Sequence, residues 1–159
     1  TDDPTVIVDL GDVDATPGQN IADIIDMNDT VLEIDNKSLT NRPDLWGHYG
    51  IARELAAIYK LPLKLLDEFD APTGLKDYDV EIINAEKCYR YAALEIRNLS
   101  VKESPTWMKA AIINGGMRPI NAIVDITNYV MLSVGQPTHA FDRTHVKGEK
   151  IIIRDARAA

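Results

Sequence analysis

The sequence predicts an α+β fold in which a mixed or antiparallel sheet packs against helices. Some short segments alternate apolar and polar residues, a pattern typical of half-buried strands. Others place apolar residues three and four positions apart, a pattern typical of one face of a helix. The strands and helices are mixed along the chain without an internal repeat, and this mixture favours the α+β class.

The first 34 residues are expected to contain two short strands and a brief helix. Residues 5–10 and 31–34 have the pattern of strands, and residues 17–27 have that of one or two helical turns.

A longer helix follows the turn-rich run SLTNRPDLWG. We expect it to begin at Leu45, with the side chain of Asp44 as its N-cap. Apolar residues recur at helical spacing up to Tyr59, and Pro62 ends the helix soon afterwards because the residue before a proline is driven out of the helical region.

Two further helices are expected in the second half of the chain. The first has Ser104 as its N-cap and Pro105 as its first residue, and it ends at residues 115–116, which are both glycine. The second spans residues 119–134 and is stopped by Gly135. Four side chains of the first helix are expected to point inward: Trp107, Met108, Ala111 and Ile112.

Strands flank these two helices in the sequence. Residues 66–78 form a polar connection with proline and glycine, and strands are expected at 80–83 and 89–97. After the second helix, an extended THAFD segment leads to a last strand at residues 151–154.

Composition narrows the class of protein. A chain of 159 residues with 45% hydrophobic and 26% charged residues is typical of a globular domain, and no apolar run approaches the roughly 20 residues of a membrane span. The net charge of −8 argues against a free-standing nucleic-acid binder, because phosphate contacts need clustered Lys and Arg. The acidic N-terminus has no basic region of a signal peptide, and the single cysteine, Cys88, fits a reducing compartment. We therefore expect a cytoplasmic protein.

Charge is unevenly spread along the chain. Residues 1–36 contain no Lys or Arg, although Asp and Glu recur there. This change predicts a domain boundary near residue 35, which divides the chain into parts at residues 1–34 and 35–159.

One segment contains more polar residues than a helix needs in order to pack. It is residues 116–142, GMRPINAIVDITNYVMLSVGQPTHAFD. Its polar side chains are Arg118, Asn121, Asp125, Thr127, Asn128, Gln136, His139 and Asp142. This run is the strongest candidate for a functional site.

Each candidate in the run has a structural alternative. His139 follows a helix stop, where an imidazole with a near-neutral pKa could position or activate a water, or could simply bond a nearby backbone group. Thr127 and Asn128 could line a pocket or make local bonds on the helix surface. Arg118 could hold a carboxylate or a phosphate, or form a surface ion pair.

Other chemistries have less support. His139, Asp142 and His145 have a spacing that invites a metal interpretation, but residues three apart in an extended segment point to opposite faces. Pairing of Cys88 with His139 is less favoured than a buried cysteine, and no phosphate-binding glycine loop occurs. Four aromatic residues could stack on bases, but their aliphatic neighbours favour core packing: Trp46, Trp107, Tyr89 and Tyr91.

Two segments resemble the beta subunit of bacterial phenylalanine–tRNA ligase. They are DNKSLTNRPDLWGHYGIARELA, residues 35–56, and the run of residues 116–142. Their order and separation also agree with that family, so the resemblance covers essentially the whole chain. It implies that residues 1–34 are the tail of a preceding small domain. It also implies that residues 35–159 are the N-terminal and central part of a truncated B3/B4 editing module.

The resemblance implies a hydrolytic function. In that family, the editing module hydrolyses tyrosine wrongly attached to phenylalanine tRNA, because an apolar pocket cannot strongly reject an isostere that adds a hydroxyl. The family's editing histidine matches His139, and its pocket residues match Thr127 and Asn128. Gln136 and Pro137 match the neck of that pocket, and Arg118 is the weakest match. Three further residues are expected to determine the fold: Pro119, Asp125 and Gly135.

The resemblance also implies partners and cofactors. We expect a fragment of a larger multidomain subunit that pairs with an alpha subunit in a heterotetramer of two alpha and two beta chains and binds phenylalanine tRNA. The whole enzyme would use ATP and magnesium, and the fragment would use no cofactor. The acidic residue that bonds the tyrosyl hydroxyl in the family lies downstream of Ala159, so the fragment alone is expected to be inactive. Two alternatives are a non-catalytic structural or tRNA-contact scaffold within the synthetase and, less favoured, a stand-alone deacylase.

Overall fold

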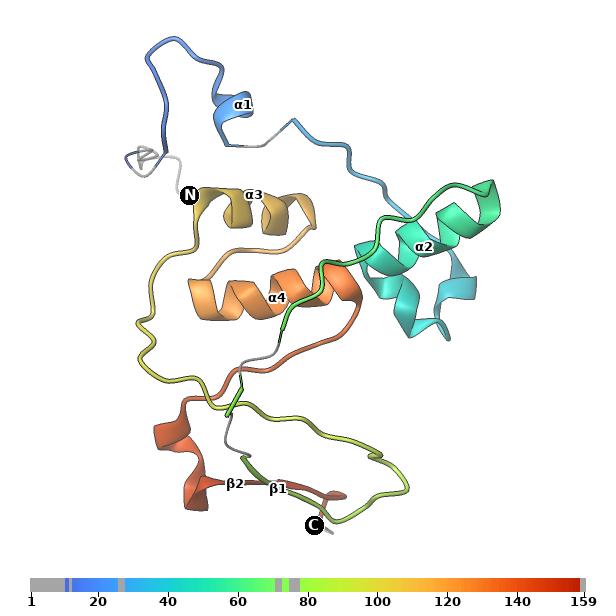
Figure 1. The fold of residues 1–159 in the computed structure, drawn as a ribbon, viewed down its shortest axis with the longest axis vertical. Helices are drawn as coiled ribbons and strands as arrows, with labels where there is room; N and C mark the ends of the chain where they lie inside the picture. Colours follow the sequence, from blue (N-terminus) through green and yellow to red (C-terminus); the bar gives the residue numbers. More distant parts are fainter. Residues whose placement is uncertain (1–10, 12, 26–27, 71–72, 75–77, 158–159) are drawn as a thin grey trace. The chain divides into compact units, whose positions relative to one another are not determined.

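A computed structural model describes residues 11, 13–25, 28–70, 73–74 and 78–157. The chain divides into two compact units, one of residues 1–64 and 101–140, the other of residues 65–100 and 141–159. The first unit holds the helices α1 to α4, and the second holds the strands β1 and β2 (Figure 1). Among the described residues, no helix is long and apolar enough to cross a membrane.

The core of the first unit lies where α3 (Thr106–Asn114) packs against α4 (Ala122–Val134). Ile112 of α3 is fully buried, and α2 (His48–Tyr59) contacts α4. The other buried apolar side chains are Leu45, Met108 and Ala110. Trp107 is half-exposed, so of the four side chains expected to point inward only Met108 and Ile112 are buried.

Helix α2 begins three residues later than the sequence predicts. Two short 3-10 turns, Lys37–Leu39 and Pro43–Trp46, precede it, and Gly47 is its N-cap. The predicted cap, Asp44, lies in the second turn, where its carboxylate accepts hydrogen bonds from the guanidinium groups of Arg42 and Arg53. The predicted end is confirmed, because Lys60 adopts a left-handed φ of 56° directly after Tyr59.

The start of α3 also differs from the prediction. Pro105, not Ser104, occupies the N-cap position, and no side chain caps the helix. The Ser104 hydroxyl instead donates a hydrogen bond to the carboxylate of Asp125 in α4. Ser104 and Asp125 are the two buried polar side chains of the described residues, so a buried polar partner takes the place of the cap. The predicted stop is confirmed, since Gly115 follows Asn114 as the C-cap.

Helix α4 ends where the sequence predicts but begins three residues later, at Ala122 rather than Pro119. The Asn121 side chain accepts hydrogen bonds from the backbone N–H groups of Ile123 and Val124, so the helix starts just after Asn121. Gly135 ends the helix at a left-handed φ of 76°, a conformation that favours glycine.

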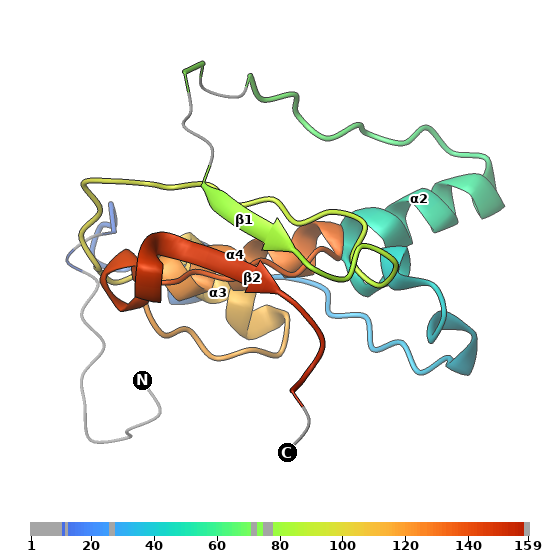
Figure 2. The same cartoon turned by 90° about the horizontal axis from the view of Figure 1, so that it is seen from below.

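The second unit contains a parallel pair of strands. Strand β1 (Asp79–Ile82) pairs with β2 (Lys150–Ile153) (Figure 2). Val80 lies opposite Ile151. The strands predicted at 80–83 and 151–154 are therefore confirmed within one residue, and so is the α+β class. The pairing is parallel, whereas we predicted a mixed or antiparallel sheet. A parallel pair needs a long crossover connection, and here it contains α3 and α4.

Two of the remaining strand predictions are wrong, and a third lies outside the described residues. Residues 31–34 form no strand and their side chains are exposed. The strand predicted at residues 89–97 is also wrong. The exposure of these residues alternates, but they form no strand ladder with another described segment. The strand at residues 5–10 lies outside the described residues. The short helix predicted within residues 17–27 is confirmed as α1 (Ile21–Ile24).

Candidate functional site

Helix α4 places two candidate residues at consecutive, half-buried positions. The Thr127 hydroxyl donates a hydrogen bond to the Val124 carbonyl at 2.6 Å, so this side chain makes the local bond that a helix surface allows. The Asn128 side chain makes no hydrogen bond to another described residue. Its amide therefore has both a donor and an acceptor available for a ligand.

A short extended segment, residues 136–140, follows α4, and we call it the His139 segment. All five of its residues are exposed. The Gln136 amide lies 3.4 Å from the Pro137 carbonyl, at the long end of hydrogen-bond distances. His139 is thus carried by the backbone that leaves the C-terminal end of α4.

Arg118 belongs to the opposite end of α4. It is exposed and precedes Pro119, in the connection between α3 and α4. The 13 residues of α4 give that helix a length of about 20 Å. The chain therefore enters α4 near Arg118 and leaves it toward His139 at points about 20 Å apart.

A buried hydrogen-bonded group fixes the first turn of α4. Asp125 is 1% exposed, and its carboxylate accepts hydrogen bonds from the backbone N–H of Ile120 at 2.8 Å and from the Ser104 hydroxyl. This geometry agrees with the interpretation of Asp125 as fold-determining, because it joins the segment before α3 to the start of α4.

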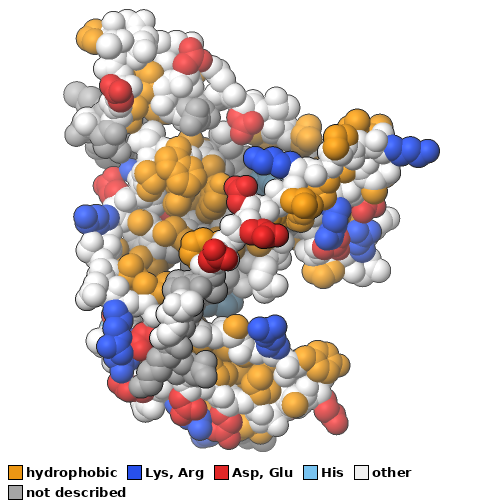
Figure 3. Space-filling model, viewed as in Figure 1, with side chains coloured by type: hydrophobic (Ala, Val, Ile, Leu, Met, Phe, Trp, Pro, Cys, Tyr) orange, Lys and Arg blue, Asp and Glu red, His pale blue; other side chains and the backbone are white. Residues whose placement is uncertain are grey.

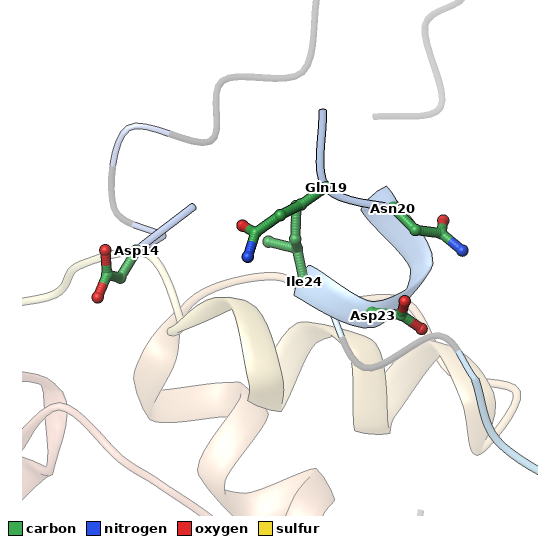
Figure 4. Close-up of a pocket in the computed structure, with 5 residues that line it drawn as sticks. All are labelled: Asp14, Gln19, Asn20, Asp23 and Ile24. Carbon is green, nitrogen blue, oxygen red and sulfur yellow. The ribbon is translucent and has the colours of Figure 1, made fainter. Parts of the chain in front are cut away.

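Sequence reasoning did not single out a cavity of about 290 Å³ near α1 (Figure 4). Its lining residues are Asp14, Gln19, Asn20, Asp23 and Ile24, and none of the candidate residues is among them. The Asn20 side chain caps α1, and the Gln19 side chain accepts a hydrogen bond from the Thr16 backbone. The side-chain amides of Gln19 and Asn20 therefore bond nearby backbone N–H groups, and no sequence motif pointed to these residues.

The structure gives no geometric support to a metal site at His139, Asp142 and His145. His145 Nδ1 lies 3.5 Å from Asp142 Oδ2. Asp142 caps a 3-10 turn, Arg143–His145, and the hydroxyl and backbone N–H of Thr144 hold the pKa of its carboxyl below the usual value. Among the described residues, no group of three His, Cys, Asp or Glu is arranged to hold a metal ion.

The aromatic residues divide between packing and exposure. Trp107 and Tyr129 meet edge to face with ring centroids 5.5 Å apart, so they pack between α3 and α4. Trp46 and Tyr89 are 66% and 90% exposed, so the expectation that they pack in the core is wrong for the described structure.

Comparison with known proteins first shows which domain family the C-terminal half of the chain matches. Residues 87–159 match the model of a domain family described as the B3/4 domain. A phenylalanine–tRNA ligase beta subunit from Solibacter usitatus is 48% identical over 131 residues, which are 82% of this chain and 17% of that protein. Similar subunits from Desulfotalea psychrophila and Thermotoga maritima are 44% and 39% identical over 86% and 88% of this chain, and over 17% and 18% of their own lengths.

The chain belongs to the phenylalanine–tRNA ligase beta-subunit family. It spans less than one fifth of the length of these curated relatives.

Proposed function

We propose that this chain contributes part of the editing module of a phenylalanine–tRNA ligase, which hydrolyses tyrosine attached to phenylalanine tRNA. The observation that carries the proposal is the continuous segment of α4 and residues 136–140. This segment places Thr127 and Asn128 on a helix and exposes His139 directly after its end. Membership of the beta-subunit family supports the assignment of these residues to that activity.

The reaction we propose for His139 is general-base catalysis. Its imidazole accepts a proton from a water molecule as the water oxygen adds to the carbonyl carbon of the tyrosyl ester. The ester C–O bond then breaks, and the terminal ribose hydroxyl of the tRNA leaves with the proton returned by the imidazolium. A histidine can both accept and return this proton near pH 7 because its ordinary pKa lies near 6.5.

Thr127 and Asn128 are the proposed wall of the amino-acid pocket. The Asn128 amide has no partner among the described residues, so it can bond a polar group of a bound tyrosine. A pocket of polar groups binds phenylalanine less well, because those groups lose their water and gain no partner. Gln136 and Pro137 form the proposed neck of the pocket, and Arg118 is the proposed contact for a carboxylate or phosphate.

The proposed partners are phenylalanine tRNA and an alpha subunit, in a cytoplasmic heterotetramer of two alpha and two beta chains. The net charge of −8 supports a division of labour in which other parts of the subunit supply the main tRNA contacts. ATP and magnesium are expected at the site of aminoacylation rather than in this chain.

A deacylation assay of the assembled ligase tests the proposal. His139→Ala is expected to slow hydrolysis of tyrosyl-tRNA about 100-fold or more, the usual contribution of a general base, while phenylalanine charging stays intact. His145→Ala is the matched control, because the His145 side chain is 85% exposed and lies beside the carboxylate of Asp142, 3.5 Å away. An unchanged hydrolysis rate in His139→Ala refutes the role of His139.

A structural scaffold is the second candidate function, and the exposed apolar surface favours it. Figure 3 shows hydrophobic side chains gathered over α3, and Trp107 and Ile113 of that helix are 49% and 53% exposed. Such surface is typical of a part that packs against neighbouring domains. A tyrosine titration followed by NMR separates the two functions. Shifts at Thr127, Asn128 and His139 support a pocket, and their absence supports a scaffold.

A further inference from the structure

The start of α2 and the end of α4 meet backbone to backbone (Figures 1 and 2). A Cβ atom placed on Gly47 would lie 2.2 Å from the backbone nitrogen of Gly135 and 2.7 Å from the carbonyl carbon of Val134. Ordinary contacts of a Cβ atom are 3.4 Å or longer, so no side chain fits at Gly47 unless the backbones separate. The close approach therefore requires glycine at position 47.

A hydrogen bond joins the same two helix ends. His48, the first residue of α2, places its Nδ1 atom 2.7 Å from the carbonyl oxygen of Leu132. This carbonyl is one of the last four of α4, which have no partner within a helix. Because a carbonyl only accepts hydrogen bonds, Nδ1 carries the proton and donates it to Leu132.

The chain leaves this contact directly into the His139 segment. Gly135 lies against the start of α2 and the turn before it, and its own φ of 76° turns the backbone out of α4. Only three residues, 136–138, separate Gly135 from His139, and all of them are exposed. The contact between the start of α2 and the end of α4 therefore holds the point from which the His139 segment leaves.

We propose that Gly47 and His48 are positioning residues for His139. Gly47 allows the contact between the two helix ends, and His48 fixes its register by bonding Leu132. Neither residue touches the substrate in this account; each acts through the direction in which Gly135 sends the following segment. The inference rests on the proposed function of His139 and adds residues that no motif in the sequence marked for that role.

The geometry sets the expected size of the effect. The methyl group of Gly47→Ala must move from 2.2 Å to at least 3.4 Å from the Gly135 nitrogen, so the helix ends separate by about 1 Å. A displacement of about 1 Å at a reacting group can reduce a rate by about 100-fold. Removal of one hydrogen bond in His48→Ala is expected to reduce the rate about 3- to 10-fold.

The test is single-turnover hydrolysis of tyrosyl-tRNA by the assembled ligase, measured as a function of enzyme concentration. Gly47→Ala and His48→Ala are expected to lower the limiting rate constant and leave the half-saturating concentration unchanged. His48→Asn is expected to restore most of the rate, because the asparagine amide can donate from nearly the position of Nδ1. A residue that only stabilised the fold would leave the rate constant of the folded enzyme unchanged.

Controls separate this inference from the proposed function. Gly18→Ala is a glycine control that strains the local backbone, because the φ of Gly18 is 94°, but its methyl group meets nothing within 4 Å. It is expected to hydrolyse tyrosyl-tRNA at the wild-type rate. Phenylalanine charging reports whether each variant is folded, and the His48→Ala and His48→Asn pair decides the matter if Gly47→Ala does not fold.

Wild-type rates in both His48→Ala and Gly47→Ala, with a slow His139→Ala, overturn the positioning role and leave the proposed function intact. A change confined to the half-saturating concentration also overturns it. A wild-type rate in His139→Ala instead overturns the proposed function, and the positioning role fails with it.

Discussion

Replacement of Asp125 by alanine should loosen α4 more than any other single loss of a hydrogen-bonding side chain in the first unit. The carboxylate is 1% exposed and accepts hydrogen bonds from the Ile120 backbone and the Ser104 hydroxyl. Hydrogen bonds to a charged group contribute about 1.5–3 kcal/mol each, and alanine leaves both donors unpaired. We therefore expect Asp125→Ala to lower the free energy of opening of α4 by about 3–5 kcal/mol.

Amide hydrogen exchange across residues 117–134 of the subunit measures this effect. A loss of about 3–5 kcal/mol corresponds to exchange that is faster by about 100-fold to 1,000-fold or more. Asp125→Asn is expected to lower the free energy of opening of α4 by only about 1–2 kcal/mol. The asparagine amide can still accept a hydrogen bond from the Ile120 backbone and donate one to the Ser104 hydroxyl.

An exposed aspartate provides the matched control. Asp155 also takes part in two hydrogen bonds, from Asn84 at 2.6 Å and Lys87 at 2.7 Å, but its side chain is 55% exposed. Water replaces these partners in Asp155→Ala, so little change in exchange is expected. Equal exchange of α4 in Asp125→Ala and the wild type would show that the buried hydrogen bonds do not hold the helix.

Two further predictions use the same exchange measurement. Ile112→Ala should lower the free energy of unfolding by about 2–5 kcal/mol, because Ile112 is fully buried. Ile113→Ala, at a residue that is 53% exposed, should lower it by about 0.5 kcal/mol or less. Equal losses in the two variants would contradict the assigned core. The second concerns Asp44, whose pKa the hydrogen bond from Arg42 lowers from 3.8 to about 2. Since folding favours the charged carboxylate, its contribution is complete above pH 3.8 and is lost as the pH falls toward about 2. Exchange in α2 should therefore rise in that window in the wild type, and this rise should be reduced in Asp44→Asn; an identical pH dependence in both would contradict the assignment.

Helix boundaries were predictable where one local group decides them. Gly135 can adopt a left-handed φ at no steric cost, and a predicted helix end there is confirmed to the residue. The same holds for α2, which ends at Tyr59 shortly before Pro62. These signals act within a few residues and can be read from one sequence.

Capping residues were not predictable where a distant partner competes for the side chain. Ser104 has the sequence context of an N-cap, yet its hydroxyl bonds Asp125, 21 residues away in the chain. Asp44 likewise bonds Arg53 across nine residues instead of capping α2. Sequence periodicity does not record which of two available partners a polar side chain will take.

The candidate site was only partly visible in the sequence. Thr127, Asn128 and His139 stand out because polar residues are unexpected in and after an apolar helix. Gly47 and His48 do not stand out, because their roles come from contacts with Gly135 and Leu132, more than 80 residues away. Such contacts are set by the packing of α2 against α4.

The central claim is that His139 removes tyrosine from phenylalanine tRNA. The most direct measurement is the accumulation of tyrosyl-tRNA when the assembled ligase is supplied with tyrosine, ATP and phenylalanine tRNA. We expect the wild type and His145→Ala to accumulate almost none, and His139→Ala to accumulate it while still charging phenylalanine normally. Equally low tyrosyl-tRNA in His139→Ala and the wild type would contradict the account.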